Sequence, residues 1–254
     1  MVRFRRSHLF FTCIIAWSSE IFRSTDGSGI TWLEPPPSET IIDDLNVTEA
    51  YKSLVKGSLN AELSCNFSLS ADLSIITVSM QFGSTPVANF AQSQQALSVR
   101  QAFKSRFNVT WVPNKLKLIF FQVTSADEGE FQCVVLTLGS PGANIQTWKR
   151  NIQVSLLVPP SITEITGNTV SEGENVTLHC SAKGTPDPNT TWTRPSDDRV
   201  VTMPLINISR HDVRDYRCTA DNGVGSPATK DVFIHVQCVG PFALLLDSLS
   251  LHII

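Results

Sequence analysis

Short segments in which apolar and polar residues alternate occupy much of this 254-residue chain. The pattern occurs in "VTLHC" (176–180), "DVFIHVQ" (231–237), "KLKLIFFQV" (115–123) and "FQCVVL" (131–136). A half-buried strand has this period of two, because successive side chains point to opposite faces of a sheet. Turn-forming residues separate the segments, and no long helical pattern follows the first twenty residues. The sequence therefore predicts an all-β chain.

A boundary falls at "LLVPPSITEI", where Pro159 and Pro160 cannot donate to a β-ladder and stiffen the chain as an extended link. We expect one domain over residues 30–158 and a second over 159–237. Each holds one well-separated pair of cysteines, so the chain repeats one plan imperfectly. Residues 19–29 are expected to be an N-terminal linker, and 238–254 form an apolar tail.

The first 18 residues have the features of a secretory signal peptide. Three arginines precede a short apolar run that ends in "AWS", with small residues at the positions a signal peptidase reads. The alternative is a membrane anchor, but the run is shorter than the roughly 20 apolar residues that span a bilayer. A secreted or cell-surface location is predicted. The formal net charge of −3 gives no reason to expect nucleic acid.

Cysteine usage agrees with secretion. Cys13 leaves with the signal peptide and Cys238 has no evident partner, which leaves both a thiol and an intermolecular bond open. The other four can pair in three ways and are expected to form disulfides: Cys65, Cys133, Cys180 and Cys218.

Six Asn-X-Ser/Thr sequons without a central proline predict a glycosylated surface. Their asparagines are Asn46, Asn66, Asn108, Asn175, Asn189 and Asn207. Where a sequon lies in an alternating segment, its asparagine is out of phase with the apolar positions and is expected to face solvent.

The segments "GENVTLHCSAKGTPDPNTTWTRP" and "LINISRHDVRDYRCTADNGVGSPA" resemble an immunoglobulin domain of the intermediate (I) set, as in neural cell-adhesion molecules and hemicentins. The resemblance implies a β-sandwich bridged by Cys180 and Cys218, with Trp192 packed on the disulfide. It also implies that Tyr216 forms a tyrosine corner after Asp212. Arg214 stands where the family usually has glycine, so backbone strain is expected there if φ is positive.

The first half resembles a variable-type immunoglobulin domain more distantly. "SADEGEFQC" matches the family's Asp-X-Gly-X-Tyr-X-Cys box through Asp127 and Cys133, with Phe131 in the tyrosine position. The resemblance implies a Cys65–Cys133 disulfide, an ion pair between Arg106 and Asp127, and two additional strands between the cysteines. The core tryptophan is missing, and Met80 is the candidate for its place.

No catalytic constellation stands out, so neither an enzyme nor a cofactor is predicted. The histidines are scattered, and no phosphate loop or metal-binding motif occurs. "SADEGE" lacks the ligand alternation of a calcium loop. "TWKR" (147–150), with Lys115 and Lys117, gives at most weak contact with anionic glycans, and a solvated strand edge explains these residues better.

The resemblance directs attention to one face of the first domain, because variable-type domains commonly pair through the sheet of strands C, F and G. Phe131, Cys133 and Val135 are expected to point inward. The outward positions would then be Ser79, Gln81, Val134 and Leu136. Exposed apolar residues there would mark a partner site; scattered surface hydrophobics and glycan shielding are the alternatives.

The leading hypothesis is an extracellular two-domain glycoprotein that binds another protein, the same or different, in cell adhesion or recognition. A soluble decoy or receptor fragment for a growth factor or immune ligand, and a matrix module, are the alternatives. The tail "CVGPFALLLDSLSLHII" is a poor lipid-anchor signal without a polar spacer, and we favour the end of a shortened product. Membrane association is expected only through such an anchor.

Overall fold

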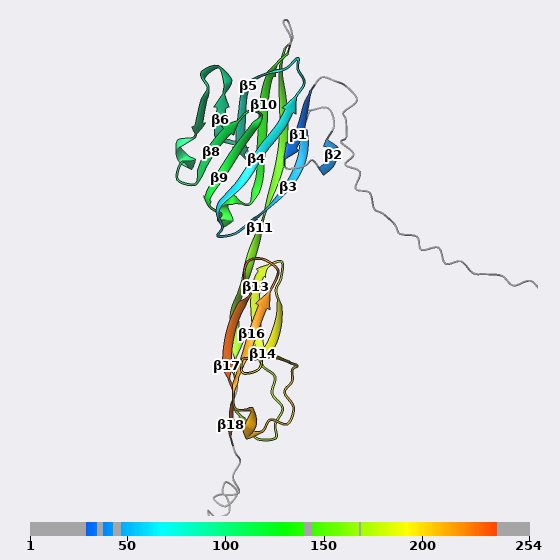
Figure 1. The fold of residues 1–254 in the computed structure, drawn as a ribbon, viewed down its shortest axis with the longest axis vertical. Coiled ribbons are helices and arrows are strands. Elements are labelled where there is room, and N and C mark those ends of the chain that lie inside the picture. The colour runs from blue at the N-terminus through cyan, green and yellow to red at the C-terminus, as the bar shows by residue number, and fades with distance from the viewer. Residues whose placement is uncertain (1–28, 35–37, 43–46, 140–143, 168, 238–254) are drawn as a thin grey trace, which may run out of the picture.

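The computed structural model shows two β-sandwiches stacked end to end and joined by one strand, β11 (Ile145–Thr166) (Figure 1). It describes residues 29–34, 38–42, 47–139, 144–167 and 169–237. The predicted all-β fold of two tandem immunoglobulin-like sandwiches is confirmed. The expectations for the signal peptide, Asn46, Cys238 and the C-terminal tail lie outside the described residues.

The first domain has a smaller and a larger sheet. The smaller sheet is antiparallel, in the order β1 (Ile30–Glu34), β4 (Leu59–Leu69), β9 (Lys115–Gln122) and β8 (Phe107–Val112). The larger sheet runs in the order β2 (Ser38–Ile42), β3 (Val47–Val55), β11, β10 (Gly129–Leu138), β5 (Ser74–Phe82), β6 (Thr85–Ala91) and β7 (Ala96–Val99). Short 3₁₀ turns are η1 (Gln92–Gln94), η2 (Gln101–Phe103) and η3 (Ser125–Asp127). Strands β6 and β7 extend the larger sheet as the two additional strands of a variable-type domain do.

The core of the first domain lies between these sheets. A disulfide joins Cys65 on β4 to Cys133 on β10, with 6.0 Å between the Cα atoms. Met80 on β5 is fully buried and lies directly opposite Cys133. Phenylalanines fill the remaining space: the Phe120 ring packs edge-on against Phe107 and Phe131, at centroid distances of 5.0 and 5.9 Å. The phenylalanine cluster and the disulfide therefore belong to one core, in which Met80 holds the strand position that the resemblance assigns to tryptophan.

The second domain is smaller. The last part of β11 pairs with β13 (His179–Thr185), and a short parallel pair joins β12 (Thr169–Ser171) to β18 (His235–Gln237). The facing sheet has the order β15 (Arg199–Val201), β14 (Asn189–Arg194), β16 (Asp215–Asp221) and β17 (Ala228–Phe233), and η4 (Arg210–Asp212) precedes β16. A disulfide joins Cys180 to Cys218, and the buried Trp192 lies opposite Cys218.

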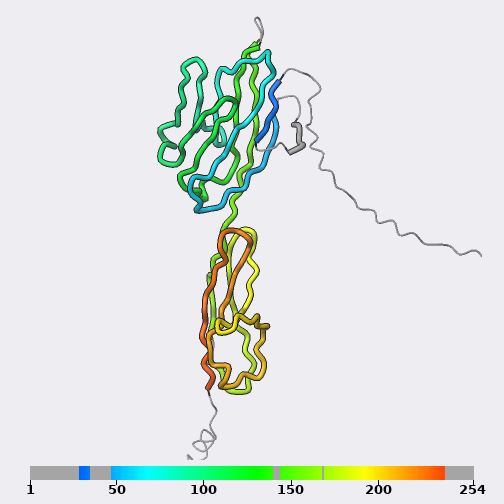
Figure 2. Tube along the Cα trace, viewed as in Figure 1, coloured from blue at the N-terminus to red at the C-terminus, as the bar shows by residue number. Residues whose placement is uncertain are grey.

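Strand β11 carries the chain from one sandwich into the other, as the trace in Figure 2 shows. Its pairing with β3 ends at Leu157, and its pairing with β13 includes Val158 and resumes at Ser161. Pro159 and Pro160 lie in the gap, where no ladder bond requires their missing N–H groups. The same extended segment therefore serves as the last strand of one domain and the first of the next.

In the second domain, the condition for strain at Arg214 is not met, and the expected tyrosine corner at Tyr216 is wrong. Arg214 is not among the described residues with positive φ, whereas Gly129, in the matching place of the first domain, has φ 138°. The backbone before β16 therefore takes a path that tolerates a side chain, and no strain arises at Arg214. Tyr216 is buried, but its hydroxyl makes no hydrogen bond to the described part of the chain; it lines a hollow with Arg194 and Asp212 instead.

Candidate functional site

The outward face of the larger sheet in the first domain is broad and carries no sequon asparagine within its described strands. Register places Val134 of β10 between Ser79 of β5 and Lys149 of β11. Gln81 lies beside Gln132, whose side-chain amide donates a 2.7 Å hydrogen bond to Asn151. The face thus combines short polar side chains with amide pairs in its centre.

The four positions expected to form a partner site do lie on neighbouring strands, but they differ in exposure. Leu136, Ser79 and Gln81 are partly exposed. Val134 exposes only 8% of its surface, so its expected exposure is wrong. The reason is that β10 runs through the interior of the sheet, where Ser79 and Lys149 flank Val134 on both sides. Leu136 is therefore the accessible apolar residue among the four.

The structure adds a residue to this face that alternation along β10 and β5 does not reveal. Tyr51 of β3 is 65% exposed and lies opposite Gln153 of β11. It borders a hollow of about 230 Å³ whose lining includes Glu130 and Asn151. Tyrosine is enriched at protein interfaces because it pairs a large apolar ring with a polar tip. No sequence signal identifies Tyr51, because the parallel pairing of β3 with β11 joins segments about a hundred residues apart.

The opposite sheet carries the two described sequons of the first domain. Asn108 on β8 is exposed and Asn66 on β4 is half-buried, and both point away from the core. The remaining described sequon asparagines, all exposed, lie in the second domain: Asn175, Asn189 and Asn207. Asn175 accepts a 2.9 Å hydrogen bond from the backbone N–H of Asn207, so these two sequons adjoin. Glycans on Asn66 and Asn108 would not cover the larger sheet, whereas the Asn46 sequon continues into Val47 and Thr48 of β3.

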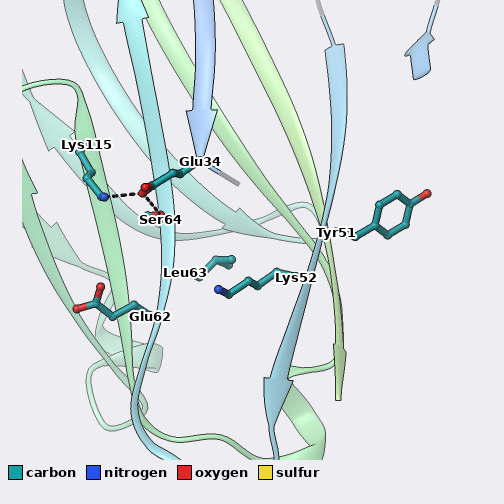
Figure 3. A pocket seen from close by; sticks show the side chains of 7 residues that line it. All are labelled: Glu34, Tyr51, Lys52, Glu62, Leu63, Ser64 and Lys115. Atoms are coloured by element: carbon teal, nitrogen blue, oxygen red, sulfur yellow. Dashed lines mark hydrogen bonds and ion pairs between the residues drawn. The ribbon is translucent and has the colours of Figure 1, made fainter. Parts of the chain in front are cut away.

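A hollow of about 480 Å³ opens beside β3 and β4 (Figure 3). Glu34 binds Lys115 at 2.6 Å and accepts a weaker bond from Ser64, while Lys52 extends toward Leu63 and Tyr51 points away. The hydrogen bond and charge of Lys115 hold the pKa of Glu34 below its usual value. Glu34 and Lys115 therefore neutralise one another in the lining, and Lys117 neutralises Glu62.

The expected contact surface for anionic glycans is not assembled. Lys115 and Lys117 lie on β9 of the smaller sheet, and Glu34 and Glu62 neutralise them. Lys149 faces outward on the larger sheet, and Arg150 is fully buried with its guanidinium 5.5 Å from the Trp32 ring. Burial lowers the pKa of Arg150 to about 10, so it remains a cation inside the core. These side chains face different directions and cannot act as one patch.

Asp127 and Asp212 precede the second cysteine of their domains, and the contacts of both carboxylates stabilise the local fold. Asp127 is buried, forms an ion pair with Arg106, and accepts bonds from the Thr124 N–H and hydroxyl at 2.6 and 2.8 Å. Asp212 accepts the equivalent pair from Ser209 at 3.0 and 2.9 Å. Each carboxylate closes a capping box before the strand that carries the second cysteine of its domain. Within the described residues, no group of three metal-binding side chains occurs, and no helix has the length and apolarity to cross a membrane.

The comparisons with known proteins agree with this architecture. Residues 159–222 match the model of the immunoglobulin domain. Limbic system-associated membrane protein of Rattus norvegicus is 33% identical over 118 residues, which cover 44% of this chain and 33% of that protein. Lachesin of Drosophila melanogaster is 27% identical over 146 residues, covering 52% and 39%. The chain thus spans little more than a third of the length of these relatives.

Solved structures show the same fold. The first two immunoglobulin domains of DIP-gamma superpose with a TM-score of 0.50 at 20% identity, covering 83% of this chain and 99% of that one. The N-terminal eight immunoglobulin domains of Down syndrome cell adhesion molecule give 0.50 at 19% identity, covering 72% and 23%. Residues 159–222 therefore belong to the immunoglobulin-domain family, and the two described sandwiches share the fold of tandem immunoglobulin domains.

Proposed function

We propose that this protein acts outside the cell as an adhesion or recognition protein, and that the larger sheet of its first domain binds another protein. The observation that carries the proposal is the contrast between the two sheets. The described sequons of that domain lie on the smaller sheet, while the larger one exposes Tyr51 and leaves Leu136 partly exposed among mostly polar side chains. The similarity to limbic system-associated membrane protein supports an extracellular location.

The composition of the face suits reversible protein binding. Non-obligate interfaces are about as polar as the rest of a protein surface, and a few aromatic or apolar residues dominate their energy. Leu136 lies beside Thr77 and Thr147, and Gln132 and Asn151 form an amide pair farther along the same two strands. Such groups can exchange water for a partner's hydrogen bonds. The proposal therefore assigns this face to reversible protein binding.

The test replaces the accessible apolar residue of the face. Leu136→Glu places a charge at the proposed contact, and we expect at least a tenfold loss of binding, about 1.4 kcal/mol or more. Sedimentation of the secreted full chain measures self-association, and cytometry measures its binding to cell surfaces. Val112→Glu is the matched control, because Val112 is an exposed strand residue on the opposite sheet. A folded Leu136→Glu variant that binds like the unmodified protein would refute the proposed face.

Retention of the chain distinguishes adhesion from the alternatives. An adhesion protein stays on the expressing cells or bridges them, whereas a decoy accumulates in the medium and captures a soluble ligand. Recovery in detergent-insoluble matrix would instead indicate a structural module. Cell fractionation of the tagged full chain gives all three readouts in one experiment.

A further inference from the structure

The smaller sheet of the first domain exposes an aromatic residue that the core does not use. Phe121 follows Phe120 at the end of β9, and 45% of its surface is exposed, although Phe120 is fully buried. Alternation therefore turns Phe121 onto the outer face, on the same side as the half-buried Ile119. An exposed phenylalanine on a strand face gains from an apolar cover.

A sequon lies diagonally across the strand pair from Phe121. Asn108 of β8 is the register partner of Ile119, and Phe121 is therefore its diagonal neighbour. Opposite Cβ atoms are about 5 Å apart and diagonal ones about 7 Å, which is within reach of a long substituent. The Asn108 Oδ1 accepts a 2.8 Å bond from the Val109 N–H, and no hydrogen bond in the described structure engages its Nδ2. Nδ2 is the atom that carries the sugar in an N-glycan.

We propose that Phe121 and Ile119 form an intramolecular platform for the first N-acetylglucosamine of a glycan on Asn108. A pyranose presents a face of C–H groups with slight positive charge, and an aromatic ring presents a face of slight negative charge. The sugar stacks on Phe121, covers its exposed ring and stabilises the smaller sheet. This inference rests on the proposed extracellular function, because only a chain that enters the secretory pathway meets the glycosylation machinery.

The second sequon of the same sheet provides a matched control. Asn66 of β4 lies opposite Lys115, and its neighbours are the Glu34–Lys115 ion pair rather than an aromatic ring. Lys115 is four residues from Ile119 along β9, about 13 Å in a strand. A glycan on Asn66 therefore starts far from Phe121. Any general effect of glycosylation on stability appears at both sites, but coupling to Phe121 appears only at Asn108.

The experiment is a double-mutant cycle on the full chain secreted from mammalian cells. Thr110→Ala removes the glycan, and Asn108→Gln removes it by a second route. Phe121→Thr removes the ring while keeping a good strand residue. We expect each single change to lower the melting temperature of the first domain by about 2–4 °C, and the double variant to fall no further than one single variant. Ser68→Ala, which removes the Asn66 sequon, should have the same effect with or without Phe121.

Two further measurements need no variant. Trimming with an endoglycosidase that leaves one sugar should preserve the melting temperature, and the N-acetyl methyl resonance of that sugar should be shifted upfield by the ring. Mass spectrometry that finds Asn108 unmodified would overturn the inference, as would additive effects of Thr110→Ala and Phe121→Thr. If Phe121→Thr abolishes partner binding and glycan removal has no effect, the ring is a protein contact and the inference is wrong. None of these results changes the outcome of Leu136→Glu, so the two proposals fail separately.

Discussion

Asp127 is a buried carboxylate of the first domain, and Arg106 is its cationic partner. The guanidinium also donates to the Ala126 carbonyl at 3.2 Å, so it holds η3 against β8. Asp127 is buried whereas Arg106 is about one-third exposed, so removing the arginine leaves a buried carboxylate with only its Thr124 hydrogen bonds, and we expect Arg106→Leu to cost about 2 kcal/mol of unfolding free energy. Urea unfolding measures this loss. Lys117→Met breaks the surface pair with Glu62 as a control and should cost less than about 1 kcal/mol.

Asp212 makes the second domain sensitive to acid. Burial acts to raise its pKa, but the hydrogen bonds from Ser209 outweigh this, so the pKa is lowered overall. A carboxyl whose folded pKa is lowered adds stability above its unfolded pKa, near 4, and that stability disappears as the pH falls through the folded value. We expect Asp212→Asn to cost about 1 kcal/mol at pH 7 and to flatten the loss of stability below about pH 4.

Urea titrations of the second domain between neutral and acid pH test this prediction. The exposed loop residue Asp187 supplies the control, since Asp187→Asn makes the same change in charge without a capping box. An Asp212→Asn variant with the acid sensitivity of the unmodified protein would contradict the assigned role.

At the scale of strands, alternation shows which side chains point inward but not how deeply they are buried. In β9 the prediction is accurate, because Leu116, Leu118 and Phe120 are all buried. In β10 the same alternation misjudges Val134, whose exposure depends on neighbours from β5 and β11. Strand order is a long-range property, and the sequence of β10 does not contain it.

The strand register also shows that the two cores place different residues opposite the second cysteine of the disulfide. Met80 lies opposite Cys133, and Trp192 lies opposite Cys218, so the two residues hold the same place in their domains. The missing tryptophan could be noticed from the sequence, but the phenylalanine cluster of the same core could not. The candidate face was predictable as a set of strands through the family resemblance. Tyr51 was not, because it depends on the parallel pairing of β3 with β11.

At the scale of the whole molecule, the junction between the domains decides how the first domain is presented. Pairing of Leu157 with Val55 ends the first sandwich, and pairing of Val158 with Thr185 begins the second. Asn222 braces this point: its side-chain amide donates to the carbonyls of Val158 and Pro186 at 2.9 and 2.8 Å. A Cβ on Gly184 would lie 2.7 Å from that amide, so the position tolerates only glycine without a shift.

We expect the Asn222 brace to limit bending between the domains. Asn222→Asp keeps the size of the side chain but replaces its two donors with acceptors that repel both carbonyls, so the junction should flex and the largest dimension of the molecule should vary. Small-angle X-ray scattering of the full chain measures this as a broader distribution of interatomic distances. Asp221→Asn is the control, because Asp221 supports the same turn by accepting a hydrogen bond from the Gly223 N–H. If both variants scatter like the unmodified protein, the Asn222 hydrogen bonds do not limit bending. Strand β11 alone then sets the arrangement of the two domains.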